Sequence, residues 1–126
     1  MRGGWHGIVS SIRMGLINAT SETKLDKKAR SSNLQQVADH IQSHSAGNAV
    51  VLTGDTNALY TSPDENIRVF EDQNRMTNPW VELIRNGTVP SEGSNVPECD
   101  IPTSNNTCQA LDKILYVLLP SYLNAY

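Results

Sequence analysis

The hydrophobic positions of the segment 29–45 recur with the period of an α-helix. They stand at i, i+3, i+4 and i+7, the spacing that places side chains on one buried face. The residues that share this spacing are Leu34, Val37, Ala38 and Ile41. We therefore expect a helix over residues 29–45, with Ser31 or Ser32 as its N-cap, Gln35 completing a capping box, and Gly47 as its stop signal.

Two apolar runs predict strands. Residues 49–53 read Ala-Val-Val-Leu-Thr without a polar break, which is typical of a strand buried on both faces. Residues 111–117 form the second run, with Asp112 near its start. A helix, a short turn and a buried strand in this order predict an α/β layer.

Two short helices are expected between the strands. The first is opened by Ser62-Pro63-Asp64-Glu65, and its apolar side carries Ile67 and Phe70. The second is capped by Thr77 or Asn78 and has Pro79 in its first turn. Its inward side chains are expected to be Trp80, Leu83 and Ile84, and Gly87 ends it. Residues 88–108 are rich in Ser, Pro, Asn and Gly and predict a long surface loop.

Length and charge narrow the class of protein. The chain of 126 residues fits a single domain with a real core, and no apolar stretch is long enough to form a transmembrane segment. The formal net charge of −3 argues against a nucleic-acid binder that works mainly through phosphate electrostatics. The charge does not exclude an enzyme that engages a phosphate through a metal ion.

The cysteines and sequons bear on localisation. Cys99 and Cys108 flank a short polar loop, so we expect them to lie close enough to bridge. Three N-x-T sequons, at Asn18, Asn86 and Asn105, agree with a secreted parent protein. The first residues of the chain lack the continuous apolar region of a signal peptide. Localisation therefore stays open at this point.

Gly54-Asp55-Thr56-Asn57 is the strongest candidate for chemistry. It follows the predicted strand directly, and ligands of open α/β sheets bind at the carboxyl ends of strands. Asp55 could orient or deprotonate a water or bind a hard cation, and Asn57 could donate to a phosphate oxygen. The alternative is an ordinary turn at the end of a strand, where Gly, Asp and Asn are favoured.

Four stretches in order resemble the second half of an endonuclease/exonuclease/phosphatase domain, the deoxyribonuclease-I-like superfamily, and are most similar to a fungal branch of it. The stretches are residues 29–37 (ARSSNLQQV), 52–57 (LTGDTN), 80–85 (WVELIR) and 111–116 (LDKILY). The resemblance implies a partial four-layer α/β sandwich over residues 29–126, after an irregular segment 1–28. Members of the superfamily include nucleases, sphingomyelinases and inositol-phosphate phosphatases, so the phosphoester substrate stays open among these classes.

The resemblance also implies the chemistry of the site. It assigns Asp55 to the water-positioning carboxylate, Asn57 to the residue that binds the scissile phosphate, and Asp112 to the carboxylate that orients a catalytic histidine. The implied cofactor is Mg²⁺, with Asp55 as a possible ligand. The oligomeric state is not indicated.

The sequence departs from the superfamily in three respects. It contains no Ser-Asp-His motif, and it has no counterpart of the metal-binding Glu of the first half. It also lacks the His that is common before the helix that starts near Ala29, where residues 17–20 read Ile-Asn-Ala-Thr. We therefore expect a fragment of a metal-dependent phosphoesterase that is inactive as given. The alternative is a non-catalytic α/β pseudoenzyme or binding fragment.

Three other residues could be considered for a site. His40 and His44 are four residues apart, but Ile41 stands where a zinc protease needs Glu, so we expect partly solvated surface residues. Tyr60 follows the Gly-Asp-x-Asn turn and would line a substrate mouth or lie on the surface.

Overall fold

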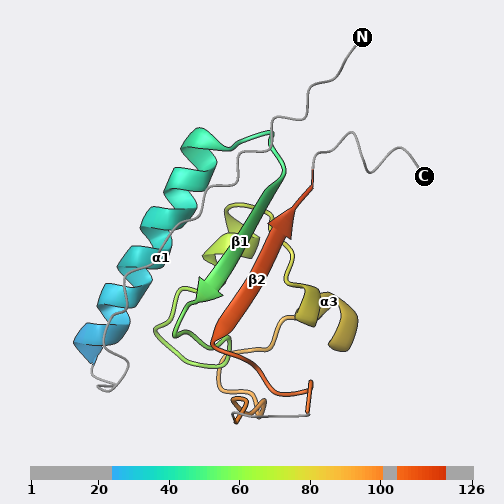
Figure 1. Ribbon diagram of the computed structural model, residues 1–126. Coiled ribbons are helices and arrows are strands. Elements are labelled where there is room, and N and C mark those ends of the chain that lie inside the picture. Colours follow the sequence, from blue (N-terminus) through green and yellow to red (C-terminus); the bar gives the residue numbers. More distant parts are fainter. Residues whose placement is uncertain (1–23, 101–104, 119–126) are drawn as a thin grey trace.

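The computed structural model describes residues 24–100 and 105–118, and all structural statements below refer to them. The elements follow in the order α1 (Lys24–His44), β1 (Val50–Asp55), α2 (Val69–Asp72), α3 (Pro79–Ile84) and β2 (Asp112–Val117). The two strands pair antiparallel, with Val50 opposite Val117 and Asp55 opposite Asp112. The fold is therefore a small α/β unit, as expected for part of an α/β domain (Figure 1).

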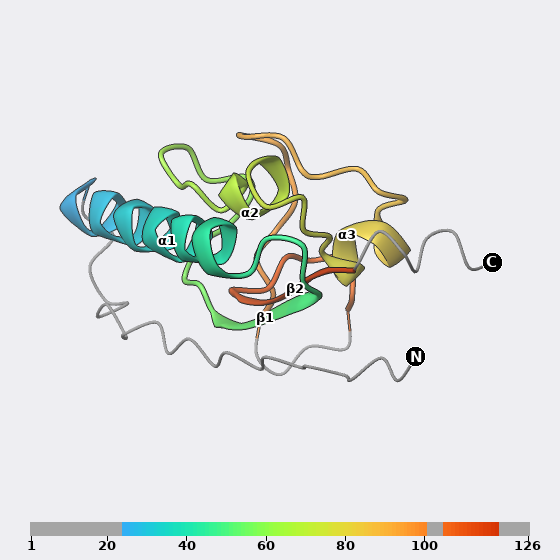
Figure 2. The same cartoon turned by 90° about the horizontal axis from the view of Figure 1, so that it is seen from above.

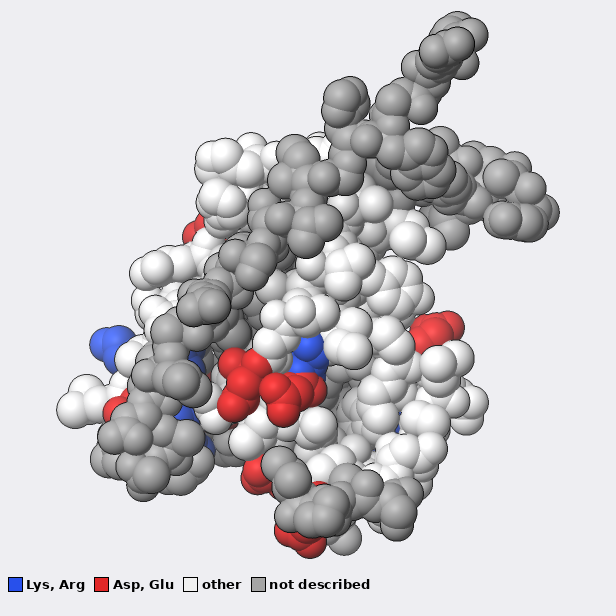
Figure 3. Space-filling view, viewed as in Figure 1, with Lys and Arg blue, Asp and Glu red and all other residues white. Residues whose placement is uncertain are grey.

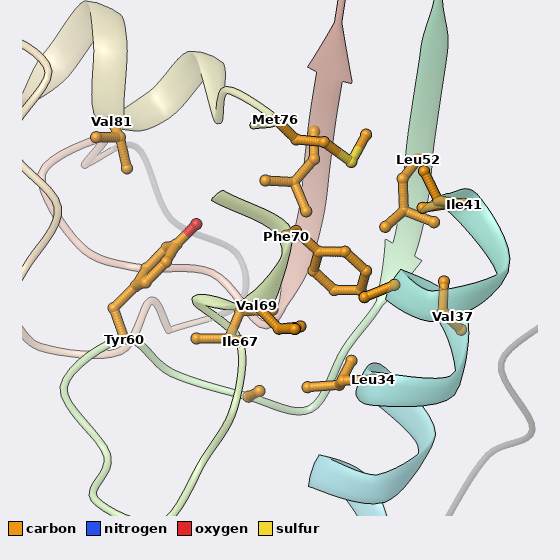
Figure 4. Packing of buried hydrophobic residues seen from close by; sticks show 13 residues of the cluster. Leu34, Val37, Ile41, Leu52, Tyr60, Ile67, Val69, Phe70, Met76 and Val81 are labelled. Carbon is orange, nitrogen blue, oxygen red and sulfur yellow. The ribbon is translucent and has the colours of Figure 1, made fainter. Parts of the chain in front are cut away.

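The helices α1 and α2 lie on the same side of the strand pair (Figure 2). The buried face of α1 carries Leu34, Val37, Ala38 and Ile41, so the helical periodicity of the sequence is confirmed. Phe70 from α2 is completely buried and lies among side chains of α1 and the strands (Figure 4). Leu52 of β1 and Leu115 of β2 face this same cluster. One apolar core thus fixes the two strands against both helices.

The beginning of α1 differs from the expectation. The helix begins at Lys24, the first described residue, so it includes five residues before the predicted start. These five residues are three Lys and one Leu, which are good helix formers, and Asp26, which is favoured in a first turn. Ser31 is therefore no N-cap: its hydroxyl donates to the carbonyl of Asp64 (3.1 Å) and accepts from the N–H of Asn66 (3.2 Å). Gln35 likewise donates to Asp39 (2.9 Å) instead of closing a capping box.

The prediction that the first strand is buried on both faces was wrong. Leu52 is buried, whereas Val51 is 64% exposed on the opposite face of the strand. Ile114 of β2 is 58% exposed on this same face. The described residues cover only one face of the sheet.

The segment after β1 turns where a helix start was expected. Asp64 has φ 66 and lies in a turn, and α2 begins only at Val69. Glu65 does not cap a helix, because its carboxylate pairs with Arg30 of α1 (2.7 Å). The predicted burial of Ile67 and Phe70 is confirmed.

The prediction for α3 is confirmed at its start and wrong on its buried face. Asn78 is the N-cap and accepts from the N–H of Trp80 (3.0 Å), with Pro79 in the first turn. The buried residue is Val81, whereas Leu83 is 76% exposed. The reason is that this short helix meets the core through Val81, with Trp80 packed against it half-buried, so the face that carries Leu83 is left uncovered by the described residues.

Candidate functional site

Asp55 and Asp112 are directly opposite each other in the strand pair. Opposed residues of an antiparallel pair project to the same face, with Cβ atoms about 4.5–5.5 Å apart. Both residues are exposed, and Figure 3 shows acidic side chains gathered over this end of the strands. The predicted proximity of these two residues is therefore found, and the roles assigned to them stay predictions.

Asn57 follows in a tight turn that is joined to Asp55. Its backbone N–H donates to Oδ1 of Asp55 at 2.9 Å, an Asx-type contact that fixes the carboxylate. Asn57 has φ 48, a left-handed conformation that Asn tolerates better than most residues. The turn places an amide side chain two residues beyond the carboxylate.

Thr56 connects this turn to the residue before Asp112. Its N–H and its Oγ1 both donate to the carbonyl of Leu111, at 3.0 and 2.8 Å. Thr56 is 5% exposed, so these hydrogen bonds are shielded from water. The two segments that carry the candidate residues are thus tied together immediately beyond the strand pairing.

Lys113 is buried beside the site, and sequence reasoning did not single it out. Its Nζ donates to the carbonyl of Ala58 at 2.8 Å and to that of Leu111 at 3.4 Å, and also contacts the carbonyl of Ala110. Burial lowers the pKa of Lys113 to about 8, and the carboxylate of Asp55 acts in the opposite direction. The available signal was a single Lys at an inward position of a predicted strand.

A cleft of about 280 Å³ opens beside Asp112. Its walls include Trp80, Ile114 and the Cys99–Cys108 bridge. The indole Nε1 of Trp80 donates to the carbonyl of Asn106 at 2.7 Å, which joins α3 to the loop before β2. The expectation that Trp80 is a core residue is therefore only partly right, because the side chain is half-buried and lines this cleft.

The expected cysteine bridge is present. Cys99 and Cys108 form a disulfide with their Cα atoms 5.0 Å apart. Both cysteines line the cleft, and further lining residues follow Cys108 directly in the chain, beginning with Gln109 and Ala110. Backbone hydrogen bonds between Cys99 and Gln109 (3.0 Å) and between Gln109 and Pro97 (2.9 Å) hold the two arms of this loop together.

Tyr60 does not line a substrate mouth. It is 1% exposed, its hydroxyl donates to Oε1 of Glu71, and it accepts from Nδ2 of Asn78 (3.1 Å). Burial raises the pKa of Tyr60 and of Glu71 above their ordinary values. Tyr60 and its two hydrogen-bond partners therefore form a polar cluster in the interior of the protein.

The histidines that are described lie apart from the site. His40 and His44 are exposed on α1, with their rings stacked at 4.2 Å, as expected for surface residues. His6 and the sequon at Asn18 lie outside the described residues. Asn86 and Asn105 are exposed.

The side-chain oxygen atoms of the candidate residues are of the type that binds hard cations, but they are few. Carboxylate and amide oxygens suit Mg²⁺, and two opposed carboxylates repel each other unless a cation lies nearby. Within residues 24–100 and 105–118, no group of three or more His, Cys, Asp or Glu side chains could hold a metal ion. The carboxylates of Asp55 and Asp112 thus suit Mg²⁺ in kind, and two carboxylates are fewer ligands than a complete protein site supplies.

None of the helices in the described part of the chain has the length and apolarity needed to cross a membrane.

The site and fold thus define part of an α/β domain with a carboxylate pair at one end of its strands. The chain is similar to curated sphingomyelinases of Mycobacterium bovis and of two Mycobacterium tuberculosis strains, with 40% identity over 85 residues in each. The matched stretch is 68% of this chain and 16% of each relative, so the chain spans only a small part of their length. These relatives are bacterial, and none of the three supports the fungal likeness.

No protein-family model matches the chain. No solved structure matches it either.

Proposed function

We propose that this chain carries part of the catalytic site of a metal-dependent phosphodiesterase-type hydrolase. The observation that supports this most directly is the position of Asp55 opposite Asp112, with Asn57 held against Asp55 through its N–H (2.9 Å). The similarity to sphingomyelinases over 85 residues agrees with this chemistry.

In the proposed reaction, Asp55 accepts a proton from the attacking water or orients it, because its carboxylate is exposed and fixed on one side by the Asn57 N–H. The side chain of Asn57 donates to a phosphoryl oxygen as negative charge develops there. Asp112 would orient an imidazole by accepting its N–H. The described histidines, His40 and His44, lie on α1 apart from the site, so this role needs a histidine from outside the described residues. A bound Mg²⁺ would supply charge neutralisation at the phosphoryl oxygens, with Asp55 as its first protein ligand.

We infer that the substrate is a phosphoester lipid of the sphingomyelin type. The three relatives are sphingomyelinases, and the net charge of −3 does not favour a polyanionic nucleic acid. An inositol phosphate is the remaining alternative, and it has no support from the relatives.

The first test is metal binding, measured with ¹⁵N-labelled full chain and Mn²⁺ as a paramagnetic stand-in for Mg²⁺. We expect selective broadening of the amide signals of Asp55, Asn57 and Asp112. Asp55→Asn should abolish it, whereas the control Asp64→Asn, at an exposed turn residue with φ 66, should leave it intact. Broadening that is absent, or that survives in Asp55→Asn, would favour the non-catalytic alternative.

The second test is substrate choice. The chain is incubated with Mg²⁺ and sphingomyelin, a short DNA duplex or an inositol phosphate, and the products are followed by mass spectrometry. Slow release of phosphocholine that is lost in Asp55→Asn supports the lipid assignment. Cleavage of DNA alone would contradict it.

A further inference from the structure

Three buried polar side chains join the segment after β1 to the segment that leads into β2. Thr56, Gln109 and Lys113 are 5%, 1% and 5% exposed. Strand pairing ends at Asp55 and Asp112, so it does not hold residues 56–61 in place. These side chains supply the connection beyond that point, since each one bonds across the two segments.

Gln109 makes the outer part of this connection. Its Oε1 accepts from the N–H of Tyr60 (2.9 Å), and its Nε2 donates to Oγ1 of Thr61 and to the carbonyl of Val96 (2.7 Å each). Its amide oxygen and nitrogen are therefore both engaged in the interior, as a buried amide requires.

Lys113 makes the inner part. An ammonium group has three donors and no acceptor, and here three carbonyls surround it. Ala58, which supplies one of them at 2.8 Å, follows Asn57 in the chain, and Leu111, at 3.4 Å, precedes Asp112. The group also lies 5.8 Å from the centre of the Tyr60 ring, a favourable position for a cation. A hydrophobic side chain would remove this donor from the carbonyl of Ala58, whereas the carbonyl of Leu111 would keep its two hydrogen bonds from Thr56.

We propose that Lys113 is a positioning residue of the candidate site, whose ammonium group holds the Asn57 turn against the start of β2. Its anchor points lie one residue from Asn57 and one residue from Asp112. Asn57 has φ 48, a left-handed conformation that is uncommon even for Asn, so the contacts around the turn help to hold it. The proposal rests on the proposed function for the importance of Asn57 and Asp112. The hydrogen bonds of the Lys113 ammonium group can be tested without an activity assay.

The first measurement uses the unaltered chain. The ammonium protons of Lys113 should exchange slowly enough to be seen in ¹H–¹⁵N spectra, with scalar coupling across the hydrogen bond to the carbonyl of Ala58. Exposed lysines such as Lys28 should give no such signal. A Lys113 ammonium group in fast exchange would overturn the proposal.

The second measurement is amide hydrogen exchange in Lys113→Met, with Lys28→Met as the matched control. We expect exchange at Thr56 and Tyr60 to accelerate at least about tenfold, and that of Tyr116, which pairs with Thr77 (2.9 Å), to stay unchanged. The chemical shifts of Asn57 should move away from those of a left-handed residue. Equal acceleration at all amides, or no change at Asn57, would show a general contribution to stability and contradict the positioning role.

The third measurement is chemical rescue of Lys113→Ala. n-Propylammonium has the atoms that this substitution removes and should restore the Asn57 shifts. Tetramethylammonium has the same charge but no N–H donor, so it should not. Restoration by both cations, or by neither in a chain that is otherwise folded, would contradict donation by the ammonium group. If the unaltered chain does not bind Mn²⁺, that result counts against the proposed function. The three measurements on Lys113 would keep their meaning, because none of them depends on metal binding.

Discussion

The guanidinium of Arg30 donates to Oε1 of Glu65 at 2.7 Å, and the two side chains are 5% and 4% exposed. The second carboxylate oxygen of Glu65 accepts from the N–H of Leu59 at 2.8 Å. This pair joins the first half of α1 to the loop that leaves the candidate site. Because the pair is buried, we expect that removal of one partner lowers the free energy of unfolding of the whole α/β unit.

We expect Glu65→Gln to lower the free energy of unfolding by about 3–5 kcal/mol, because it leaves the buried charge of Arg30 without its counter-ion. Urea unfolding followed by far-UV circular dichroism measures the change. Glu92→Gln, at an exposed loop position, is the control and should remain within about 0.5 kcal/mol of the unaltered chain. Equal effects of the two changes would contradict the importance of the pair.

Glu71 should make stability depend on pH. Burial raises its pKa in the folded state, so the folded chain binds this proton more tightly than the unfolded chain does. The contribution of Glu71 to stability is therefore complete below its unfolded pKa and is lost as pH rises through its folded pKa. In Glu71→Gln this loss should be missing, which unfolding curves between pH 4 and 8 would reveal. Parallel pH profiles for the variant and the unaltered chain would refute the assignment, and Glu82→Gln, at an exposed position, controls for surface charge.

Reduction of the Cys99–Cys108 bridge should lower the free energy of unfolding by about 2–3 kcal/mol, because the bridge restricts the unfolded chain. It should also accelerate exchange of the Trp80 indole N–H, whose acceptor is Asn106 of the bridged loop. Unfolding and indole exchange are compared with and without a thiol reductant. Unchanged indole exchange in the reduced chain would show that the loop is held by other contacts.

Core packing predicts a further contrast. Phe70→Ala should cost about 3–5 kcal/mol, since its side chain is fully buried, whereas Leu83→Ala should cost less than about 0.5 kcal/mol at a position that is 76% exposed. Thermal unfolding of both variants measures this. A large effect of Leu83→Ala would indicate that α3 is covered in solution.

The polypeptide of 126 residues should hydrolyse phosphoesters poorly. Its sequence contains no Ser-Asp-His motif, and loss of one group that stabilises charge on the phosphate typically costs about 10²–10³ in rate. The measurement is Mg²⁺-dependent hydrolysis of an aryl phosphodiester, with Asp55→Ala as the reference. Robust turnover that disappears in Asp55→Ala would show that the residues of this chain suffice.

The sequence by itself determined the elements whose patterns are local. The period of Leu34 and Ile41 specified α1, the apolar runs specified the strands, and Asn78 with Pro79 specified where α3 begins. The position of Asp55 and of Asp112 at strand ends was also expected, because Asp55 follows the first run after one glycine and Asp112 is the second residue of the other run. The short loop between Cys99 and Cys108 was sufficient to predict their bridge.

Only the tertiary structure decided which polar residues are interior and what they join. Tyr60, Glu65 and Lys113 have no local pattern that predicts burial, because their partners lie in distant parts of the chain. The exposure of Val51 likewise depends on what covers the second face of the sheet, which no local pattern encodes. A buried polar side chain is tolerated only where distant groups satisfy it, so its place becomes visible when the folded chain brings those groups together.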